Sequence, residues 1–425
     1  MLMKLFISLL IGMALWQIFD PNLRLSPKEV MVRKSLPMDV SYEMNNALRY
    51  LNSIRTDMGM EKLELNEQLS TAAKAHAGYI VVNNISSHFE EEGKRKYTGK
   101  KPHERAFATG YLSRQVSENF STSQHTGKAS IDSLMSAIYH RFGFLSTAIN
   151  EVGVGIFEDE FDSDKNAFVY LMGNSNFDKL CMEKSFRGSG KYYKACKDED
   201  HRMGGKEYEG VVNYAKQNNP KMIVYPYDGQ RDVPPAFYAE DPDPLPSYDV
   251  SGFPISVEFN DYYIKDITFV SFTLYDREEL PVKVQHMDKE SDLHQRFSSE
   301  QFALFPLKRL DYNAQYTAEF VYRHKDEMHT KRWSFYTKRI QEEFHIVDKL
   351  YDELDIELKK SYVIYFPPVD AHDLLTNLQF PQGVDIVFLD HNTIKVTVMS
   401  DEIEEFIIDT GTKKLHLKVI ESSIP

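Results

Sequence analysis

Five short blocks between residues 51 and 155 constrain the fold of this chain more than any other feature of its sequence. Within them, histidines and a carboxylate recur at the ends of apolar segments, which is how a polar site is built over a packed core. The blocks are, in order, Leu51-Asn52-Ser53-Ile54-Arg55 with Gly59 after it, Ala72-Ala73-Lys74-Ala75-His76-Ala77, Ser87-His88-Phe89-Glu90, Ser117-Glu118-Asn119, and Tyr139-His140-Arg141 running on to Val152-Gly153-Val154-Gly155.

The apolar spacing around these blocks predicts helices followed by strands. Apolar residues recur every three or four positions over residues 40–58, which indicates an amphipathic helix that ends before Gly59. A second helix is expected from Asn66, a good N-cap, and a third over residues 129–141, with His140 at its end. The expected strands are residues 152–157 and 168–172. This order predicts an α+β sandwich.

Between the second and third helices, residues 86–114 are polar and predict a long loop with short helical pieces. The run Glu90–Glu92 is typical of a solvated face, although Glu90 is near enough to His88 to tune its charge. We expect Glu104-Arg105 and Arg141 to form ion pairs that fasten this loop. His76 shares a stripe with apolar residues, so it is interpreted as a core residue.

The rest of the chain predicts β-rich modules. Residues 176–219 are polar and are interpreted as a connector or an appended subdomain. Short β-rich runs with loop signals between them point to a sandwich over residues 220–338. Short β-rich runs also occur over residues 341–425, which predicts a second, small β-rich module. The expected strands are residues 222–226, 254–259, 266–275, 280–284, 315–323, 331–337, 361–366, 384–389, 393–398 and 415–419.

Residues 1–20 combine one lysine, a short apolar run and an abrupt polar stop at Asp20-Pro21. This pattern is typical of an export signal, and retention as an N-terminal membrane tether is the alternative because no cleavage site stands out. Cys181 and Cys196 are the only cysteines, and in an oxidising compartment they are expected to form a disulfide; two structural thiols are the alternative. The net charge of -14 argues against a nucleic-acid partner.

The order and spacing of all five blocks resemble the CAP superfamily of cysteine-rich secretory and pathogenesis-related proteins, in its bacterial, cysteine-poor form. The resemblance covers residues 36–175 and implies an α-β-α sandwich, usually secreted, with a cleft lined by histidines and glutamates. Carried over by position, His88, Glu118 and His140 are the cleft residues. The Trp-Tyr-x-Glu and His-Phe-Thr segments of the eukaryotic pattern are absent, and Glu151 is a weak substitute for the fourth residue.

A second resemblance covers residues 222–338, which are similar to the Ig-like module that follows CAP domains in some bacterial exported proteins. The residues that carry it are Tyr225-Pro-Tyr-Asp-Gly-Gln-Arg-Asp-Val-Pro-Pro235, Pro306-Leu307 with Tyr316-Thr317, and Trp333-Ser-Phe-Tyr-Thr337.

These features favour an extracytoplasmic protein of the cell envelope that binds a lipid, a small apolar ligand or a partner protein through the cleft. His88, Glu118 and His140 are also the residue types that bind a divalent metal such as zinc, so a metal-dependent hydrolase of envelope peptide or ester bonds is the first alternative. A structural or adhesion protein is the second. The sequence contains no Gly-x-Ser-x-Gly elbow and no His-Glu-x-x-His motif, so it favours a protein without enzymatic activity.

Overall fold

The computed structural model describes residues 37–375 and 378–420. The expected export signal or membrane tether at residues 1–20 lies outside the described residues. Among the helices within them, none has the length and apolar character needed to cross a membrane.

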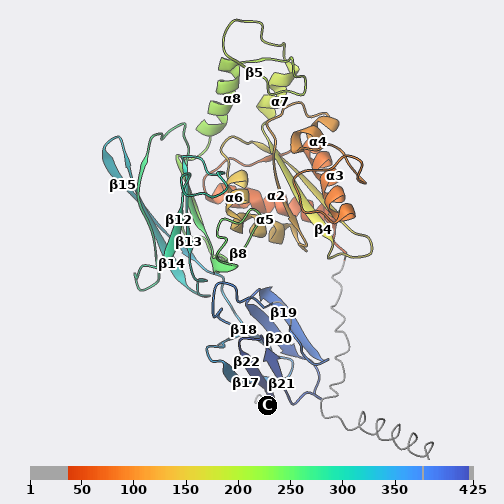
Figure 1. The fold of residues 1–425 in the computed structure, drawn as a ribbon, viewed down its shortest axis with the longest axis vertical. Coiled ribbons are helices and arrows are strands. Elements are labelled where there is room, and N and C mark those ends of the chain that lie inside the picture. The colour runs from red at the N-terminus through yellow and green to blue at the C-terminus, as the bar shows by residue number, and fades with distance from the viewer. Residues whose placement is uncertain (1–36, 376–377, 421–425) are drawn as a thin grey trace, which may run out of the picture. The chain divides into compact units, whose positions relative to one another are not determined.

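The first module is a four-stranded sheet between two layers of helices (Figure 1). The strand order is β1-β3-β4-β2, with β1 and β3 parallel and the other pairs antiparallel. The elements are α2 (Val40–Asp57), β1 (Glu64–Leu65), α3 (Glu67–Asn83), α4 (Pro102–Ala108), β2 (Ser117–Thr122), α5 (Gly127–Ser136), α6 (Ile138–Phe144), β3 (Glu151–Glu158) and β4 (Asn166–Gly173).

Strand β4 shows why this sheet needs a layer on each face. Its residues are all buried, and successive side chains point to opposite faces. Phe168 and Tyr170 pack in a core with α2 and α5, whereas Val169 and Leu171 pack in a second core with α3 and α4. The expected α+β class with an α-β-α sandwich is therefore confirmed.

The first two helices begin where the sequence predicts. The Asp39 side chain accepts a hydrogen bond from Tyr42 N at the start of α2, and the Asn66 side chain accepts one from Leu69 N at the start of α3. The third expected helix is instead divided, because Ala137 has extended backbone angles between α5 and α6.

Two glycines in β3 let the sheet approach α3 closely. A Cβ atom built on Gly153 would lie 2.1 Å from the Leu69 carbonyl carbon, and one on Gly155 would lie 2.0 Å from Lys74 N. Real Cβ atoms do not approach backbone this closely, so the Val-Gly-Val-Gly block is explained by packing.

Residues 176–219 have secondary structure of their own. Helices α7 (Ser175–Met182) and α8 (Gly205–Gln217) flank the short pair β5 (Tyr192–Tyr193) and β6 (Met203–Gly204). The Sγ atoms of Cys181 and Cys196 are 2.13 Å apart, so the expected disulfide is present. Cys196 is buried with Phe177 and Ala195 in a small core.

Residues 222–336 form two sheets that face each other. Their order is β12-β13-β10-β7 and β11-β14-β15, and the rings of Phe259 and Phe320, one from each sheet, have centroids 5.9 Å apart. The expected strand at residues 280–284 is wrong, since β12 covers Val284–Met287, and β13 was not expected. The other strands are β7 (Met222–Tyr225), β10 (Ile255–Phe259), β11 (Thr268–Tyr275), β13 (Gln301–Pro306), β14 (Gln315–His324), β15 (Glu327–Tyr336) and the hairpin β8 (Ala236–Tyr238) and β9 (Val250–Gly252).

The final module also has two sheets around one core that includes Ile364, Val396 and Leu417. Their order is β16-β18-β20-β19 and β17-β22-β21. The strands are β16 (Glu343–Ile346), β17 (Tyr351–Glu357), β18 (Ser361–Tyr365), β19 (Val384–Asp390), β20 (Thr393–Val398), β21 (Glu405–Asp409) and β22 (Lys414–Ile420).

Arg141 joins the first module to the sandwich that follows. Its side chain is fully buried, and Nη1 donates to the carbonyl of Pro254 at 2.8 Å and to Ser256 Oγ at 3.1 Å. The guanidinium also lies over the rings of Tyr225 and Phe253. The expected ion pair is therefore replaced by carbonyl and aromatic contacts across the junction.

The close approach of β3 and α3 gives a direct test. We expect Gly155→Ala to lower the stability of the full-length protein by about 3 kcal/mol, because the new methyl group overlaps the α3 backbone. The control Gly210→Ala adds the same methyl group at an exposed position of α8, where no neighbouring residue lies within 4 Å of the new atom. It should raise the stability slightly, by less than about 1 kcal/mol, because alanine favours a helix more than glycine does. Differential scanning calorimetry measures both, and equal unfolding curves for the two variants would contradict the packing argument.

Candidate functional site

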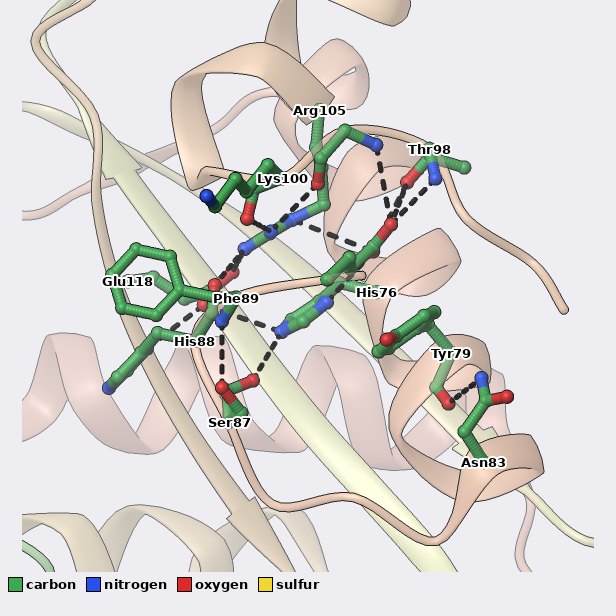
Figure 2. Close-up of polar contacts among 12 residues, drawn as sticks. His76, Tyr79, Asn83, Ser87, His88, Phe89, Thr98, Lys100, Arg105 and Glu118 are labelled. Carbon is green, nitrogen blue, oxygen red and sulfur yellow. Dashed lines mark hydrogen bonds and ion pairs between the residues drawn. The ribbon is translucent and has the colours of Figure 1, made fainter. Parts of the chain in front are cut away.

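A buried arginine is the centre of the polar cluster in the first module (Figure 2). Arg105 Nη2 donates to Glu118 Oε2 at 2.6 Å and to the carbonyl of His88 at 3.2 Å. Its Nε lies 3.9 Å from Glu90 Oε1, and Nη1 donates to the carbonyls of Gly99 and Lys100 at 3.3 Å. The expected role of Arg105 in fastening the long loop is therefore confirmed, and its partners lie in the motifs that the sequence singled out.

Short elements place these groups. Helix α4 begins with Pro102, and the Glu104 side chain accepts hydrogen bonds from Lys100 N and Lys101 N, so Glu104 caps the helix and does not pair with a charge there. Strand β2 directs Glu118 to Arg105, while the next residue, Asn119, donates to the carbonyl of His140 at 2.7 Å. Successive side chains of β2 point in opposite directions, so Glu118 and Asn119 contact opposite sides of the site.

His76 belongs to this cluster and is fully buried. Its Nδ1 lies 2.9 Å from Glu90 Oε1, and its Nε2 lies 3.1 Å from the carbonyl of Ser87 and 3.5 Å from Glu118 Oε1. Both ring nitrogens face acceptors, so the hydrogen bonds are complete when both carry a proton. His76 is a core residue, as expected, but it is a polar one.

Glu90 corrects a sequence-based interpretation. It was expected on a solvated face with Glu91 and Glu92, yet it is buried and accepts from Thr98 N at 2.6 Å. Burial alone would raise the pKa of Glu90, but the hydrogen bonds from His76 and Thr98 and the charge of Arg105 lower it below its ordinary value. Glu91 and Glu92 are exposed, so the run of three glutamates resembles a solvated face although Glu90 is buried.

Glu118 is held as a carboxylate by the same means. Burial would raise its pKa, but the hydrogen bond from His88 and the charges of Arg105 and His76 outweigh that effect, so the pKa lies below its ordinary value. A carboxylate is an acceptor only, and His88 Nδ1 lies 3.0 Å from Glu118 Oε1. His88 Nδ1 therefore donates, and in the neutral ring Nε2 carries the lone pair.

His88 and His140 lie side by side at the surface of this cluster. Their rings are stacked with centroids 6.1 Å apart, and their side chains are 34% and 14% exposed. His140 Nδ1 lies 3.2 Å from Glu240 Oε2, so each ring has a carboxylate at Nδ1. Within the described ranges, neither Nε2 has a hydrogen-bond partner, and Figure 2 shows the His88 ring directed away from Arg105.

The structure thus brings together His88, Glu118 and His140 and places Glu151 elsewhere. Glu151, at the start of β3, accepts from Tyr111 Oη at 2.7 Å and from Asn66 Nδ2 at 2.9 Å. Burial raises the pKa of Glu151 despite these bonds. Its contacts fasten β3 to α3 and to the loop after α4.

Sequence reasoning missed Glu240 entirely, placed His76 in the core rather than in the site, and connected Glu90 with the site only through its nearness to His88. Helical spacing puts His76 on a buried face, and a histidine there needs a polar partner, which was the available signal. Glu240 lies 100 residues after His140, in a different module, and carries no local motif.

The two imidazoles fit a divalent metal in part. A metal-bound histidine commonly has a carboxylate on its other ring nitrogen, which is the arrangement of His88 with Glu118 and of His140 with Glu240. Glu118 itself is directed to Arg105 and is an orienting residue. Among the residues that the structure describes, no group of three or more His, Cys, Asp or Glu side chains is arranged to hold a metal. The described part of the chain offers two imidazole ligands at this site, and any others would come from water or a bound molecule.

Comparisons with known proteins agree with the five blocks. Residues 48–173 match the family model "CAP: Cysteine-rich secretory protein family", and no curated protein matches the sequence. An extracellular protein containing an SCP domain from Bacillus anthracis is 20% identical with a TM-score of 0.28, over 32% of this chain and 41% of that one. An outer surface protein from Borrelia burgdorferi is 16% identical with a TM-score of 0.29, over 33% of this chain and 97% of that one.

The Bacillus match therefore spans about two fifths of that protein. A cysteine-rich secretory protein from Staphylococcus aureus is 14% identical with a TM-score of 0.24, over 32% of this chain and 39% of that one. The ordered blocks, the sheet between two helical layers and the family model agree on one assignment: residues 48–173 are a CAP domain of the cysteine-rich secretory protein family.

Proposed function

We propose that this chain is an extracytoplasmic binding protein of the bacterial cell envelope, and that its CAP domain binds a lipid through His88 and His140. The observation that carries the proposal is the matched orientation of the two rings. Each Nδ1 is taken by a carboxylate, so each Nε2 remains for a ligand. The similar structures from Bacillus and Borrelia are an extracellular and an outer surface protein, which supports the location.

The side chains beside these rings suit an amphiphilic ligand. Phe89, next to His88, is 53% exposed, and Phe120 packs edge-on against the His88 ring at a centroid distance of 4.7 Å. An imidazole nitrogen that presents its lone pair accepts a hydrogen bond from a hydroxyl of a polar head group, while an exposed aromatic side chain contacts the first carbons of an acyl chain. This pairing favours a lipid head group over a wholly apolar molecule.

The two carboxylates that orient the rings are themselves held by other groups of the protein. Glu118 is bonded to Arg105 and His88, and Glu240 is bonded to Ile138 N and His140. A ligand therefore meets two rings whose orientation is already fixed, and little conformational entropy is lost on binding. No serine, threonine or cysteine nucleophile is hydrogen-bonded to either ring among the described residues, so binding is favoured over covalent catalysis.

A lipid titration tests this proposal. We expect full-length protein to bind a short-chain phosphatidylglycerol below its micelle concentration, and the double variant His88→Ala and His140→Ala to bind it at least about tenfold more weakly. His372→Ala is the matched control, because His372 also has a carboxylate at Nδ1, from Asp249, but lies on the final module. Equal affinity for the wild type and the double variant, measured by NMR titration, would refute the lipid site.

A metal-dependent hydrolase is the second candidate, favoured by the carboxylate partner on each ring. In that case His88 and His140 hold zinc and leave positions for water and substrate, and the metal supplies Lewis-acid chemistry. Calorimetric titration with zinc alone separates the candidates. The metal version predicts one site per chain that the double variant loses and His372→Ala keeps, and equal weak binding by all three forms contradicts it.

A further inference from the structure

Glu240 belongs to the segment that follows the CAP domain, yet its carboxylate lies in the CAP site. It follows β8 in the loop that joins β8 to β9, and its side chain is only 9% exposed. Oε1 accepts a hydrogen bond from Ile138 N at 2.8 Å, and Oε2 lies 3.2 Å from His140 Nδ1. One carboxylate therefore contacts both the first backbone N–H and a side chain of α6.

The neighbours of His140 on α6 contact the same module. Tyr139 Oη donates to Asp292 Oδ1 at 2.6 Å, and Arg141 donates to the carbonyl of Pro254. The start of α6 is thus held by the sandwich rather than by a side-chain cap of its own, since the N-cap residue Ala137 has none. The break between α5 and α6 coincides with these contacts.

From this arrangement we propose that Glu240 is the positioning residue for His140, so that the binding site is completed by the module after the CAP domain. The inference rests on the proposed function only in naming His140 as a ligand contact. Glu240 acts through His140 and does not itself face the ligand.

The chemistry of the contact assigns a definite role. Oε1 is occupied by the N–H of Ile138, so Oε2 is the atom that faces the ring, and an ionised carboxylate has no proton to give. In the neutral ring the proton must then reside on Nδ1, and Nε2 presents its lone pair. Glu118 imposes the same tautomer on His88. Two carboxylates from two modules thereby hold both neutral rings in the same tautomer, with the proton on Nδ1 and the lone pair on Nε2.

The substitution Glu240→Gln reverses this polarity without changing the shape of the side chain. The amide oxygen must accept from Ile138 N, because an NH2 group there would face another donor. The NH2 group then faces His140 Nδ1 and donates to it, which moves the ring proton to Nε2. Tyr139→Phe is the control, since it removes one hydrogen bond across the same junction and leaves His140 untouched.

The tautomer is read by long-range ¹H–¹⁵N NMR of the full-length protein at a pH where His140 is neutral. We expect the Nδ1–H tautomer in the wild type and in Tyr139→Phe, and the Nε2–H tautomer in Glu240→Gln. An Nε2–H ring in the wild type, or no change in Glu240→Gln, would overturn the inference. Calorimetry confirms that each variant is folded.

The same variants separate this inference from the proposed function, because the tautomer is measured without ligand. If the phosphatidylglycerol site exists, Glu240→Gln should weaken lipid binding by about 10- to 100-fold, the range by which loss of an orienting partner weakens metal-binding histidine sites. A switched tautomer with no lipid binding by any form would retain Glu240 as a positioning residue and refute the lipid proposal. A switched tautomer with unchanged lipid affinity would refute its role in the binding site.

Discussion

The ion pair between Arg105 and Glu118 is the contact on which the rest of the CAP site depends. Removing both charges from water is costly, and a buried pair repays that cost only when its remaining donors and acceptors are satisfied. Here the two terminal nitrogens of the guanidinium also donate to the carbonyls of His88, Gly99 and Lys100, while Nε makes no hydrogen bond and lies 3.9 Å from Glu90 Oε1. The planar fork of arginine makes such simultaneous contacts, which a lysine ammonium would not reproduce.

His76 and Glu90 extend the buried cluster beyond this ion pair. Two buried carboxylates face one guanidinium, and the His76 ring lies between them, with Nδ1 2.9 Å from Glu90 Oε1 and Nε2 3.5 Å from Glu118 Oε1. Glu240 orients His140 from the next module, so the stacked pair is fixed by two separate carboxylates.

The sequence predicted what depends on local pattern and missed what depends on distant contacts. Spacing and caps located α2 and α3, and the strand over residues 152–157 was expected, but the close approach of its glycines to α3 is seen only in the structure. Nothing in the sequence around Ala137 signals the end of a helix. The break between α5 and α6 instead coincides with contacts from Glu240 and the sandwich, which are distant in the sequence. Glu90 looked solvated for a similar reason, since its partners His76 and Thr98 lie outside the charge run.

The central claim is that Glu118 is an ionised carboxylate inside the CAP domain. Since its pKa is depressed on folding, its contribution to stability is present above the unfolded pKa near 4.5 and is lost as pH falls through the folded pKa. A ¹³C NMR titration of the Glu118 side-chain carboxyl carbon measures this directly. The account predicts a midpoint below 4.5, and a midpoint above it would show that a neutral acid, not a carboxylate, faces Arg105 and His88.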